Sequence, residues 1–247
     1  MSVELGRRLL AETVGTGLLV TVVVGSGVMA TRLAPNEVGL QLLCNSVATA
    51  LGLTVLILAF GPASGAHFNP LISAADWLLG RGAGTGLRGR EVLPYALCQC
   101  AGAIAGAVLA DVMFDLPAAE FSAHDRSGGH LVVGEIVATA GLVFLIFSLD
   151  RTDRTSFAAP AVGAYIGSAY WFTSSTSFAN PAVTVGRAFT NTFTGIAPGS
   201  VPGFVVAQFL GAALGLGLLL ALYPAPGVVA DRMTMSQESR AVSGRTA

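Results

Sequence analysis

The feature that most constrains this chain is an internal duplication. A short motif, SGAHFNP at residues 64–70, returns as STSFANP at residues 175–181, and both copies end in Asn-Pro. The segments around the two copies also align in pairs, 11–20 with 134–143 and 98–109 with 207–218. The chain therefore consists of two related halves, which restricts it to folds with an approximate internal two-fold symmetry.

Composition predicts that both halves lie in a lipid bilayer. Of the 247 residues, 53% are hydrophobic and only 11% are charged, and the mean hydropathy is +0.70. A soluble protein of this length needs a more highly charged surface. The net charge of −1 leaves no strongly basic surface, so we expect no nucleic-acid partner. Six apolar segments are long enough to cross about 30 Å of hydrocarbon. They are 9–30, 38–60, 92–114, 131–149, 156–174 and 202–223.

Two further apolar segments, 69–79 and 180–190, are too short to cross the bilayer. Each begins at an Asn-Pro, where Asn is a favoured helix N-cap and Pro fits the first helical turn. We therefore predict two re-entrant half-helices. Three crossings per copy invert the second copy relative to the first. The predicted fold is an all-α membrane protein with six transmembrane helices, two half-helices and an inverted 3+3 repeat.

We expect one membrane domain over residues 1–226, whose two repeats cover about 5–114 and 131–223. The polar segment 227–247 is expected to be a disordered cytoplasmic tail. Arginine placement predicts the orientation, because ten arginines lie on one side of the predicted spans and three on the other. The ten are Arg7, Arg8, Arg81, Arg88, Arg90, Arg151, Arg154, Arg232, Arg240 and Arg245, and the three are Arg32, Arg126 and Arg187. The positive-inside rule then places both termini of a multi-pass plasma-membrane protein in the cytoplasm.

The half-helix N-termini are the candidate functional centre. Irregular backbone at membrane depth persists only where protein buries it or where it lines a water-filled cavity. Asn69 and Asn180 present amide donors at the positive ends of two helix dipoles, with Pro70 and Pro181 behind them. A neutral solute with an oxygen acceptor is held and oriented there, whereas a cation meets a positive potential. We also expect His67, two residues before Asn69, to line the cytoplasmic vestibule.

Two carboxylates inside predicted spans have two candidate roles. Glu12 corresponds to Glu135 in the duplication, and an ionisable residue at membrane depth is usually functional. One alternative is a proton relay, and the other is a scaffold in which each carboxylate accepts hydrogen bonds from a re-entrant loop. Their symmetric placement favours the scaffold. Gln99 and Gln208, which also correspond, are expected to brace the same loops.

An ion-coupled secondary transporter is the alternative function, because such proteins also use inverted repeats and broken helices. It would need an ion site, and Glu12 and Glu135 are the only candidates at depth. An enzyme is not expected, since His67, His124 and His130 form no metal-binding or nucleophile arrangement. We accordingly expect neither a metal nor a cofactor.

As a set, the two Asn-Pro motifs, the span-opening glutamates and the glutamines before small-residue runs resemble the aquaporin and aquaglyceroporin family, also called major intrinsic proteins. The resemblance covers roughly residues 5–225. It implies six spans with two half-helices, passive flow of water or small uncharged solutes, and a homotetramer with one pore per subunit.

The chain departs from that family at two positions. The first motif is Asn69-Pro70-Leu71, where the family usually has alanine third, although the second motif keeps Ala182. Val183 stands where the family usually has arginine. Arg187 lies four residues further along, about 6 Å along a helix, and is interpreted as a charge at the outer rim.

Offsets from the motifs predict an outer constriction of Leu51, Ser168, Ser177 and Val183. Water-selective members bring an aromatic residue, a histidine and an arginine to this ring. The predicted ring is wider, less polar and uncharged, so small polyols such as glycerol should pass together with water. By resemblance to bacterial family members, neutral metalloid acids such as arsenous acid are a further hypothesis.

Overall fold

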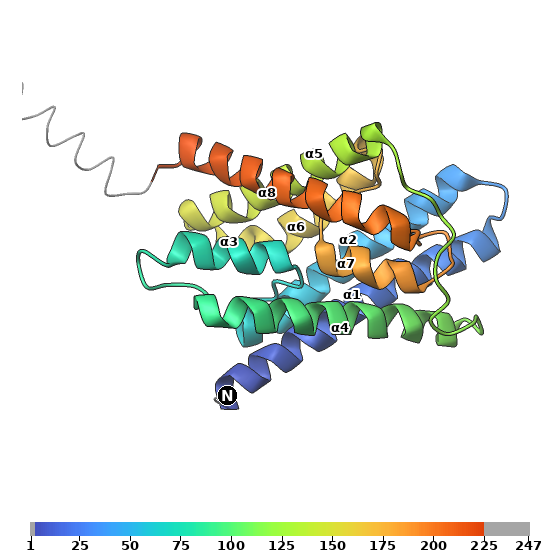
Figure 1. The fold of residues 1–247 in the computed structure, drawn as a ribbon, viewed down its shortest axis with the longest axis horizontal. Coiled ribbons are helices and arrows are strands. Elements are labelled where there is room, and N and C mark those ends of the chain that lie inside the picture. The colour runs from blue at the N-terminus through green and yellow to red at the C-terminus, as the bar shows by residue number, and fades with distance from the viewer. Residues whose placement is uncertain (1–2, 225–247) are drawn as a thin grey trace, which may run out of the picture.

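A computed structural model describes residues 3–224, and its regular structure is helical throughout that range (Figure 1). The expected tail, 227–247, lies outside the described residues. The helices are α1 (Val3–Leu33), α2 (Val38–Ser64), α3 (Pro70–Gly80), α4 (Gly89–Met113), α5 (Gly129–Arg151), α6 (Ala158–Phe172), α7 (Pro181–Gly186) and α8 (Val201–Leu222). Short 3₁₀ turns at Thr155–Phe157, Arg187–Phe189 and Pro198–Ser200 adjoin α6, α7 and α8.

Five of the described helices, α1, α2, α4, α5 and α8, are long and apolar enough to span a membrane. The sixth predicted span, 156–174, corresponds to α6, which has only 15 residues. Its helix ends at Phe172 because Thr173 adopts an extended conformation that begins the second re-entrant loop. The 3₁₀ turn before α6 adds length, and the two together reach about 28 Å. The predicted six-span architecture therefore holds, with a short sixth span.

The two half-helices start where the sequence predicts, with Pro70 and Pro181 at the first helical position and an extended asparagine as N-cap. The second half-helix is shorter than the predicted 180–190, because α7 ends at Gly186 and tightens into a 3₁₀ turn. Carbonyls beyond that point bind the outer loops instead of the helix. Arg187 O accepts from Ile196 N at 3.2 Å, and Ala188 O accepts from Ser122 N at 3.0 Å.

The internal symmetry is visible in the helix packing. In the first half α1 packs along α4, and in the second half α5 packs along α8. A Cβ atom on Gly106 would lie 2.0 Å from Gly17 O, and one on Gly215, its counterpart, would lie 2.4 Å from Ala140 O. Small residues thus allow the backbones to approach at equivalent points of both halves, as membrane helices require where lipid provides no hydrophobic drive.

Each half-helix contacts both halves of the protein. The half-helix α7 packs against α4 of the first half and α8 of its own half, whereas α3 packs against α4 and α8. Gly186 of α7 lies close to α4, since an added Cβ would lie 2.7 Å from the Ala103 backbone. The half-helices therefore lie inside the helix bundle and connect its two halves.

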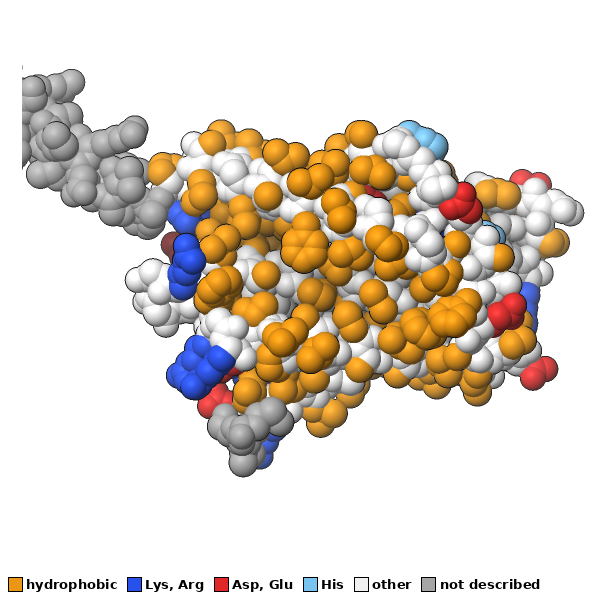
Figure 2. All heavy atoms as spheres, viewed as in Figure 1, with side chains coloured by type: hydrophobic (Ala, Val, Ile, Leu, Met, Phe, Trp, Pro, Cys, Tyr) orange, Lys and Arg blue, Asp and Glu red, His pale blue; other side chains and the backbone are white. Residues whose placement is uncertain are grey.

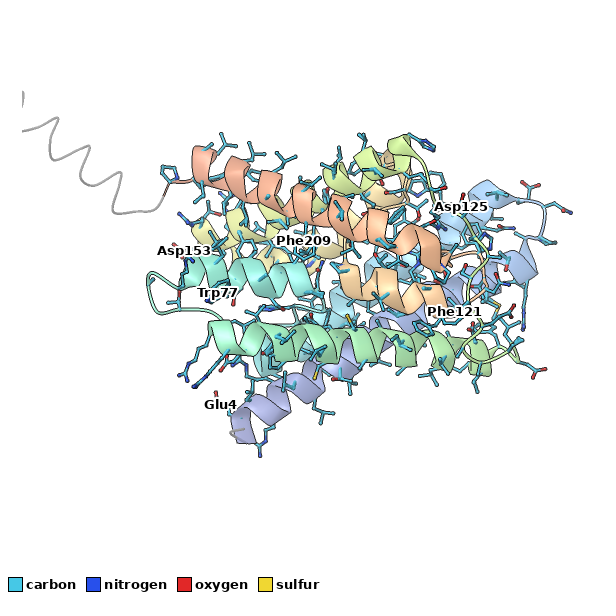
Figure 3. The ribbon with its side chains drawn as sticks, in the orientation of Figure 1. Glu4, Trp77, Phe121, Asp125, Asp153 and Phe209 are labelled. Atoms are coloured by element: carbon cyan, nitrogen blue, oxygen red, sulfur yellow. The ribbon has the colours of Figure 1, made fainter. Side chains whose placement is uncertain are left out.

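The surface matches a membrane-embedded body. Hydrophobic side chains cover the middle of the molecule, and charged side chains gather at its two ends (Figure 2). Figure 3 shows Glu4, Trp77 and Asp153 at one end, and Phe121 and Asp125 at the other. The first end also carries the end of α8 and the α3–α4 loop, which contains Arg81 and Arg88 (Figure 1).

Candidate functional site

The two asparagines at the half-helix N-termini hold the re-entrant loops together. Asn69 Oδ1 accepts from the backbone N–H of Leu71 at 3.0 Å, which caps its own helix, and Nδ2 donates to Ala179 O in the opposite loop at 2.8 Å. Asn180 mirrors it, since Oδ1 accepts from Ala182 N at 2.9 Å and Nδ2 donates to Phe68 O at 2.7 Å. The tips of α3 and α7 therefore meet inside the protein.

The Glu12 carboxylate is the anchor of the first loop. It is fully buried and accepts four hydrogen bonds, three of them from loop residues 64–68. These donors are the Ser64 hydroxyl at 2.6 Å, His67 N at 3.0 Å and Phe68 N at 2.7 Å. The fourth donor is Gln99 Nε2 at 2.8 Å, which also donates to Ser73 Oγ. A carboxylate that accepts four donors stabilises a loop backbone that has no helical partners.

Glu135 does the same in the second half. It accepts from the Ser175 hydroxyl at 2.7 Å, Phe178 N at 2.8 Å, Ala179 N at 2.9 Å and Gln208 Nε2 at 2.6 Å. This geometry holds both loops in conformations that non-glycine residues rarely adopt, with φ of 50° at Phe68 and 48° at Ala179. Those same two residues offer the carbonyls that the asparagine side chains bind.

A cavity of about 620 Å³ runs past the asparagine pair. Both asparagines line it, and each keeps one side-chain N–H that makes no hydrogen bond within the described residues. The long helices contribute mainly apolar side chains to its lining, and the re-entrant segments contribute polar ones. The apolar residues include Leu19, Val23, Leu53, Ile57, Val162 and Ile166, and the polar residues include His67, Asn69, Ser177, Asn180 and Arg187.

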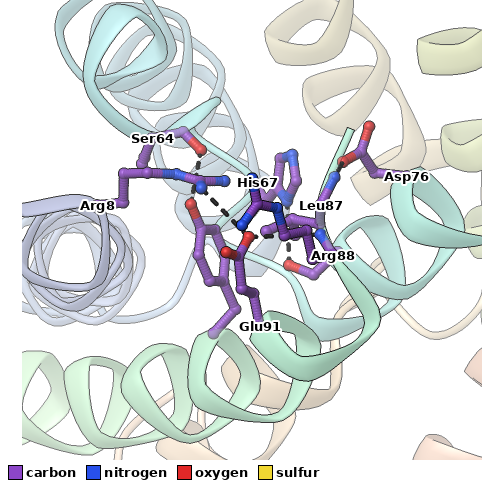
Figure 4. A network of polar contacts seen from close by, with 9 residues as sticks. Arg8, Ser64, His67, Asp76, Leu87, Arg88 and Glu91 are labelled. Atoms are coloured by element: carbon purple, nitrogen blue, oxygen red, sulfur yellow. Dashed lines mark hydrogen bonds and ion pairs between the residues drawn. The ribbon is translucent and has the colours of Figure 1, made fainter. Parts of the chain in front are cut away.

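His67 lines the cavity two residues before Asn69. Its Nδ1 is 3.1 Å from Ser73 Oγ, and its ring tilts against Tyr95 at 5.7 Å between centroids. Polar contacts link the segments around His67 (Figure 4). They join Arg8 Nη1 to Glu91 Oε2 at 3.3 Å and Tyr95 Oη to Ser64 O at 3.1 Å.

Two of the predicted constriction residues do not line the cavity. Leu51 is 65% exposed on the outer face of α2, and Ser168 is exposed on α6, where its hydroxyl donates to Tyr165 O. The prediction was wrong because positions two residues apart lie on nearly opposite faces of a helix. The lumen is instead lined by the neighbours two positions before and after each residue. They are Thr49 and Leu53 on α2, and Ile166 and Tyr170 on α6.

The structure brings together the other two predicted constriction residues, Ser177 and Val183, which both line the cavity. Leu71, the unusual third residue of the first motif, does not line it. Its side chain is buried in an apolar cluster with Ile72, Ala75 and Val143. Leu71 therefore contributes to packing within this apolar cluster and not to the cavity wall.

Arg187 is not the rim charge that the sequence suggested. It is only 2% exposed and lines the same cavity as Val183. Arg187 does not continue the α-helix outward, because it opens the 3₁₀ turn after α7 and its guanidinium lies over the Phe178 ring.

Sequence reasoning also missed a contact between two spans. Thr49 Oγ1 and Tyr170 Oη are hydrogen-bonded at 3.2 Å, both buried and both lining the cavity. Helix periodicity could have identified both residues. Thr49 lies four residues from Leu53, and Tyr170 lies four residues from Ile166, so each pair shares one helix face. Within residues 3–224 no group of histidine, cysteine and acidic side chains could hold a metal ion.

Comparison with known proteins gives consistent matches. The profile of the family described as Major intrinsic protein matches residues 1–176. Aquaglyceroporin AqpS of Rhizobium meliloti (strain 1021) is 50% identical over 217 residues, which cover 87% of this chain and 90% of that protein. Aquaporin Z of Photorhabdus laumondii subsp. laumondii is 38% identical over 176 residues, 64% of this chain and 71% of that protein.

Solved structures show the same fold. The X-ray structure of the aquaglyceroporin from Plasmodium falciparum matches with a TM-score of 0.68 at 18% identity, and covers 92% of this chain and 99% of that one. Fold and cavity thus define a membrane channel built from an inverted repeat. The chain belongs to the major intrinsic protein family, whose members are channels and not enzymes.

Proposed function

We propose that this protein is a passive channel through which water and small uncharged, hydroxylated solutes cross the membrane. The observation that carries the proposal is the cavity of about 620 Å³ that passes both half-helix tips. The similarity to an aquaglyceroporin supports glycerol-like polyols among the solutes.

The asparagine pair orients the permeating molecule. Each amide uses its oxygen to cap its own helix and one N–H to bind the opposite loop. One N–H from Asn69 and one from Asn180 remain for the solute. An oxygen that accepts both donors at the positive ends of α3 and α7 is held in one orientation, while a cation is repelled there.

The residue at position 183 sets which solutes pass. Val183 and Ser177 line the cavity beyond the asparagines, and neither brings a charge or a large ring. This leaves more room than an arginine at position 183 would, which favours compact polyols and neutral metalloid acids such as arsenous acid over a water-only pore. Apolar lining residues such as Leu53 and Ile166 suit the carbon side of a polyol.

We further propose a homotetramer in the plasma membrane, with one pore in each subunit and the arginine-rich end in the cytoplasm. Seven of the ten arginines in the described residues lie in segments at that end. Exposed hydrophobic side chains on several helices support contact with lipid or with neighbouring subunits. We propose one channel domain over residues 1–226 and a cytoplasmic tail over residues 227–247.

The ion-coupled transporter is not favoured. Glu12 and Glu135, its only candidate ion-binding groups at depth, each accept four hydrogen bonds from loops and glutamines and do not line the cavity. They therefore act as scaffold.

Flux into proteoliposomes tests the proposal. Stopped-flow light scattering would follow water and glycerol, and arsenic analysis of washed vesicles would follow arsenous acid. We expect flux of all three that does not saturate and does not depend on a proton gradient. A pore that passes water alone would overturn the solute assignment, and saturable flux driven by a proton gradient would overturn the channel.

A further inference from the structure

Arg187 is a buried charge on the wall of the cavity. It is 2% exposed and lines the same cavity as Ser177 and Val183. Among the described residues, the only ion pair is that of Arg8 with Glu91, so Arg187 has no carboxylate partner. An unpaired buried charge is costly, and at membrane depth such a residue usually serves a substrate pathway.

The guanidinium is held in place but is not saturated. Its Nε donates to Thr194 O, and its central carbon lies 3.4 Å from the centroid of the Phe178 ring. Phe178 in turn packs edge-on against Phe204, with 5.1 Å between centroids. A guanidinium has five N–H donors. In Arg187, only the Nε donor makes a hydrogen bond to another described residue. The two terminal nitrogens therefore keep four donors for a molecule in the cavity.

A second unpaired polar group lines the same cavity. The Ser177 hydroxyl is buried and has no hydrogen-bond partner among the described residues. The backbone at Ser177 has φ of 51°. The next residue in the loop is Phe178, and the Arg187 guanidinium stacks over its ring. Buried polar groups are nearly always paired, so an orphaned hydroxyl on a cavity wall indicates a ligand that pairs it.

We propose that Arg187 and Ser177 form a solute-binding station that selects small oxyacids, which carry two or more oxygens on one central atom. The planar guanidinium donates to two such oxygens at once, because its fork matches oxygens held on a single atom. The Ser177 hydroxyl accepts from a hydroxyl of the same solute. Glycerol has its hydroxyls on separate carbons and gains less from the fork.

The station differs from the ring expected from family resemblance. The positive charge comes from the 3₁₀ turn after α7, one helical turn beyond Val183. Val183 therefore keeps the lumen uncharged next to the asparagine pair, and the fixed charge acts further along the pore. This inference rests on the proposed function, because it requires that the cavity is the conducting pore.

The test compares the flux of arsenous acid and boric acid with that of glycerol and water in proteoliposomes. Arg187→Gln and Ser177→Ala should each lower oxyacid flux, Arg187→Gln by about tenfold or more because hydrogen bonds from a charged donor are lost. The ratio of oxyacid flux to glycerol flux should therefore fall in each variant, because glycerol gains less from the fork. Arg187→Lys keeps the charge without the fork and should resemble Arg187→Gln for oxyacids.

Arg126 supplies the matched control. Its guanidinium also lies near the Phe178 ring, at 5.0 Å, but it does not line the cavity. Arg126→Gln should leave the ratio of oxyacid to glycerol flux unchanged. Water flux through each variant reports whether the channel has folded, and Ser177→Ala, a small change, tests the station if Arg187 variants do not fold.

The outcomes separate this proposal from the proposed function. If the unaltered protein conducts glycerol but the Arg187 and Ser177 variants keep the same oxyacid-to-glycerol ratio, the station is refuted and the channel stands. If the unaltered protein conducts no solute, the proposed function fails first. A ratio that falls equally in the Arg126 variant would show a general effect on loop structure and would also refute the station.

Discussion

The strongest quantitative prediction concerns the carboxylate of Glu135. Glu135→Gln keeps the size and shape of the side chain but replaces one acceptor oxygen with an NH₂ donor. Oε1 accepts from the Ser175 hydroxyl and Phe178 N, and Oε2 accepts from Ala179 N and Gln208 Nε2. Whichever oxygen is replaced, the new NH₂ group faces two groups that were donors.

The magnitude follows from these bonds. If the NH₂ replaces Oε2, the bonds from Ala179 N and Gln208 Nε2 are both lost. A hydrogen bond to a charged group contributes about 1.5–3 kcal/mol, so the loss is about 3–6 kcal/mol. The Gln208 side-chain oxygen is buried and unpaired, and a flip of that amide could accept from the new donor. Ala179 N has no such alternative, which leaves a lower bound of about 1.5 kcal/mol.

The assay is equilibrium or kinetic unfolding in detergent micelles, followed by circular dichroism or tryptophan fluorescence. The matched control is Glu120→Gln, because Glu120 is an exposed loop residue that accepts from the side chain of Asn191. We expect the control to change stability by less than about 0.5 kcal/mol. A Glu135→Gln loss below about 1 kcal/mol would refute the reasoning that this carboxylate holds the second loop.

Four further outcomes follow from the structure. Asn180→Asp removes the Nδ2 donor to Phe68 O and adds a negative charge, so we expect a new cation conductance in planar bilayers. Val183→Arg narrows the lumen and adds charge, and should lower glycerol flux while sparing water in stopped-flow measurements. Gly106→Val should impair folding, measured as the yield of monodisperse protein, because its Cβ would lie 2.0 Å from backbone, whereas Gly217→Ala meets nothing within 4 Å and should be tolerated. Hydrogen bonds from two serine hydroxyls and a backbone N–H hold the pKa of Asp125 below its usual range, so the carboxylate stabilises the outer loop above about pH 4 and that contribution is lost as pH falls through the lowered pKa. Asp125→Asn should speed hydrogen exchange of this loop at pH 6, and the difference from the unaltered protein should shrink as pH falls through the lowered pKa of Asp125.

Symmetry explains why much of the architecture was predictable from the sequence. Any one Asn-Pro could be an ordinary helix cap, but two in matched contexts had to belong to equivalent half-helices. The same argument paired Glu12 with Glu135, and the structure gives each carboxylate four equivalent donors. Features that repeat could be inferred because each copy constrains the interpretation of the other.

Features that do not repeat were harder to predict. Counting from the motifs gave the positions of Leu51 and Ser168 along their helices but not the directions of their side chains. A shift of two residues turns a side chain from the lumen to the outer surface of the helix bundle. Arg187 has no counterpart in the first half. Its direction depends on the 3₁₀ turn and on the Phe178 ring, neither of which leaves a pattern in the sequence.

The crossed asparagine bonds have a consequence for biogenesis. The carbonyl of Phe68 receives its partner only when Asn180 has been synthesised, 112 residues later, and α4 is likewise complete before its partner α7 has been synthesised. A nascent chain that has inserted only its first four helices therefore has a re-entrant loop whose Phe68 carbonyl lacks its donor. The surface of α4 that α7 later covers is also still exposed. The second half completes the first, so the membrane insertion machinery must keep an unfinished protein from associating with the wrong partner until translation ends.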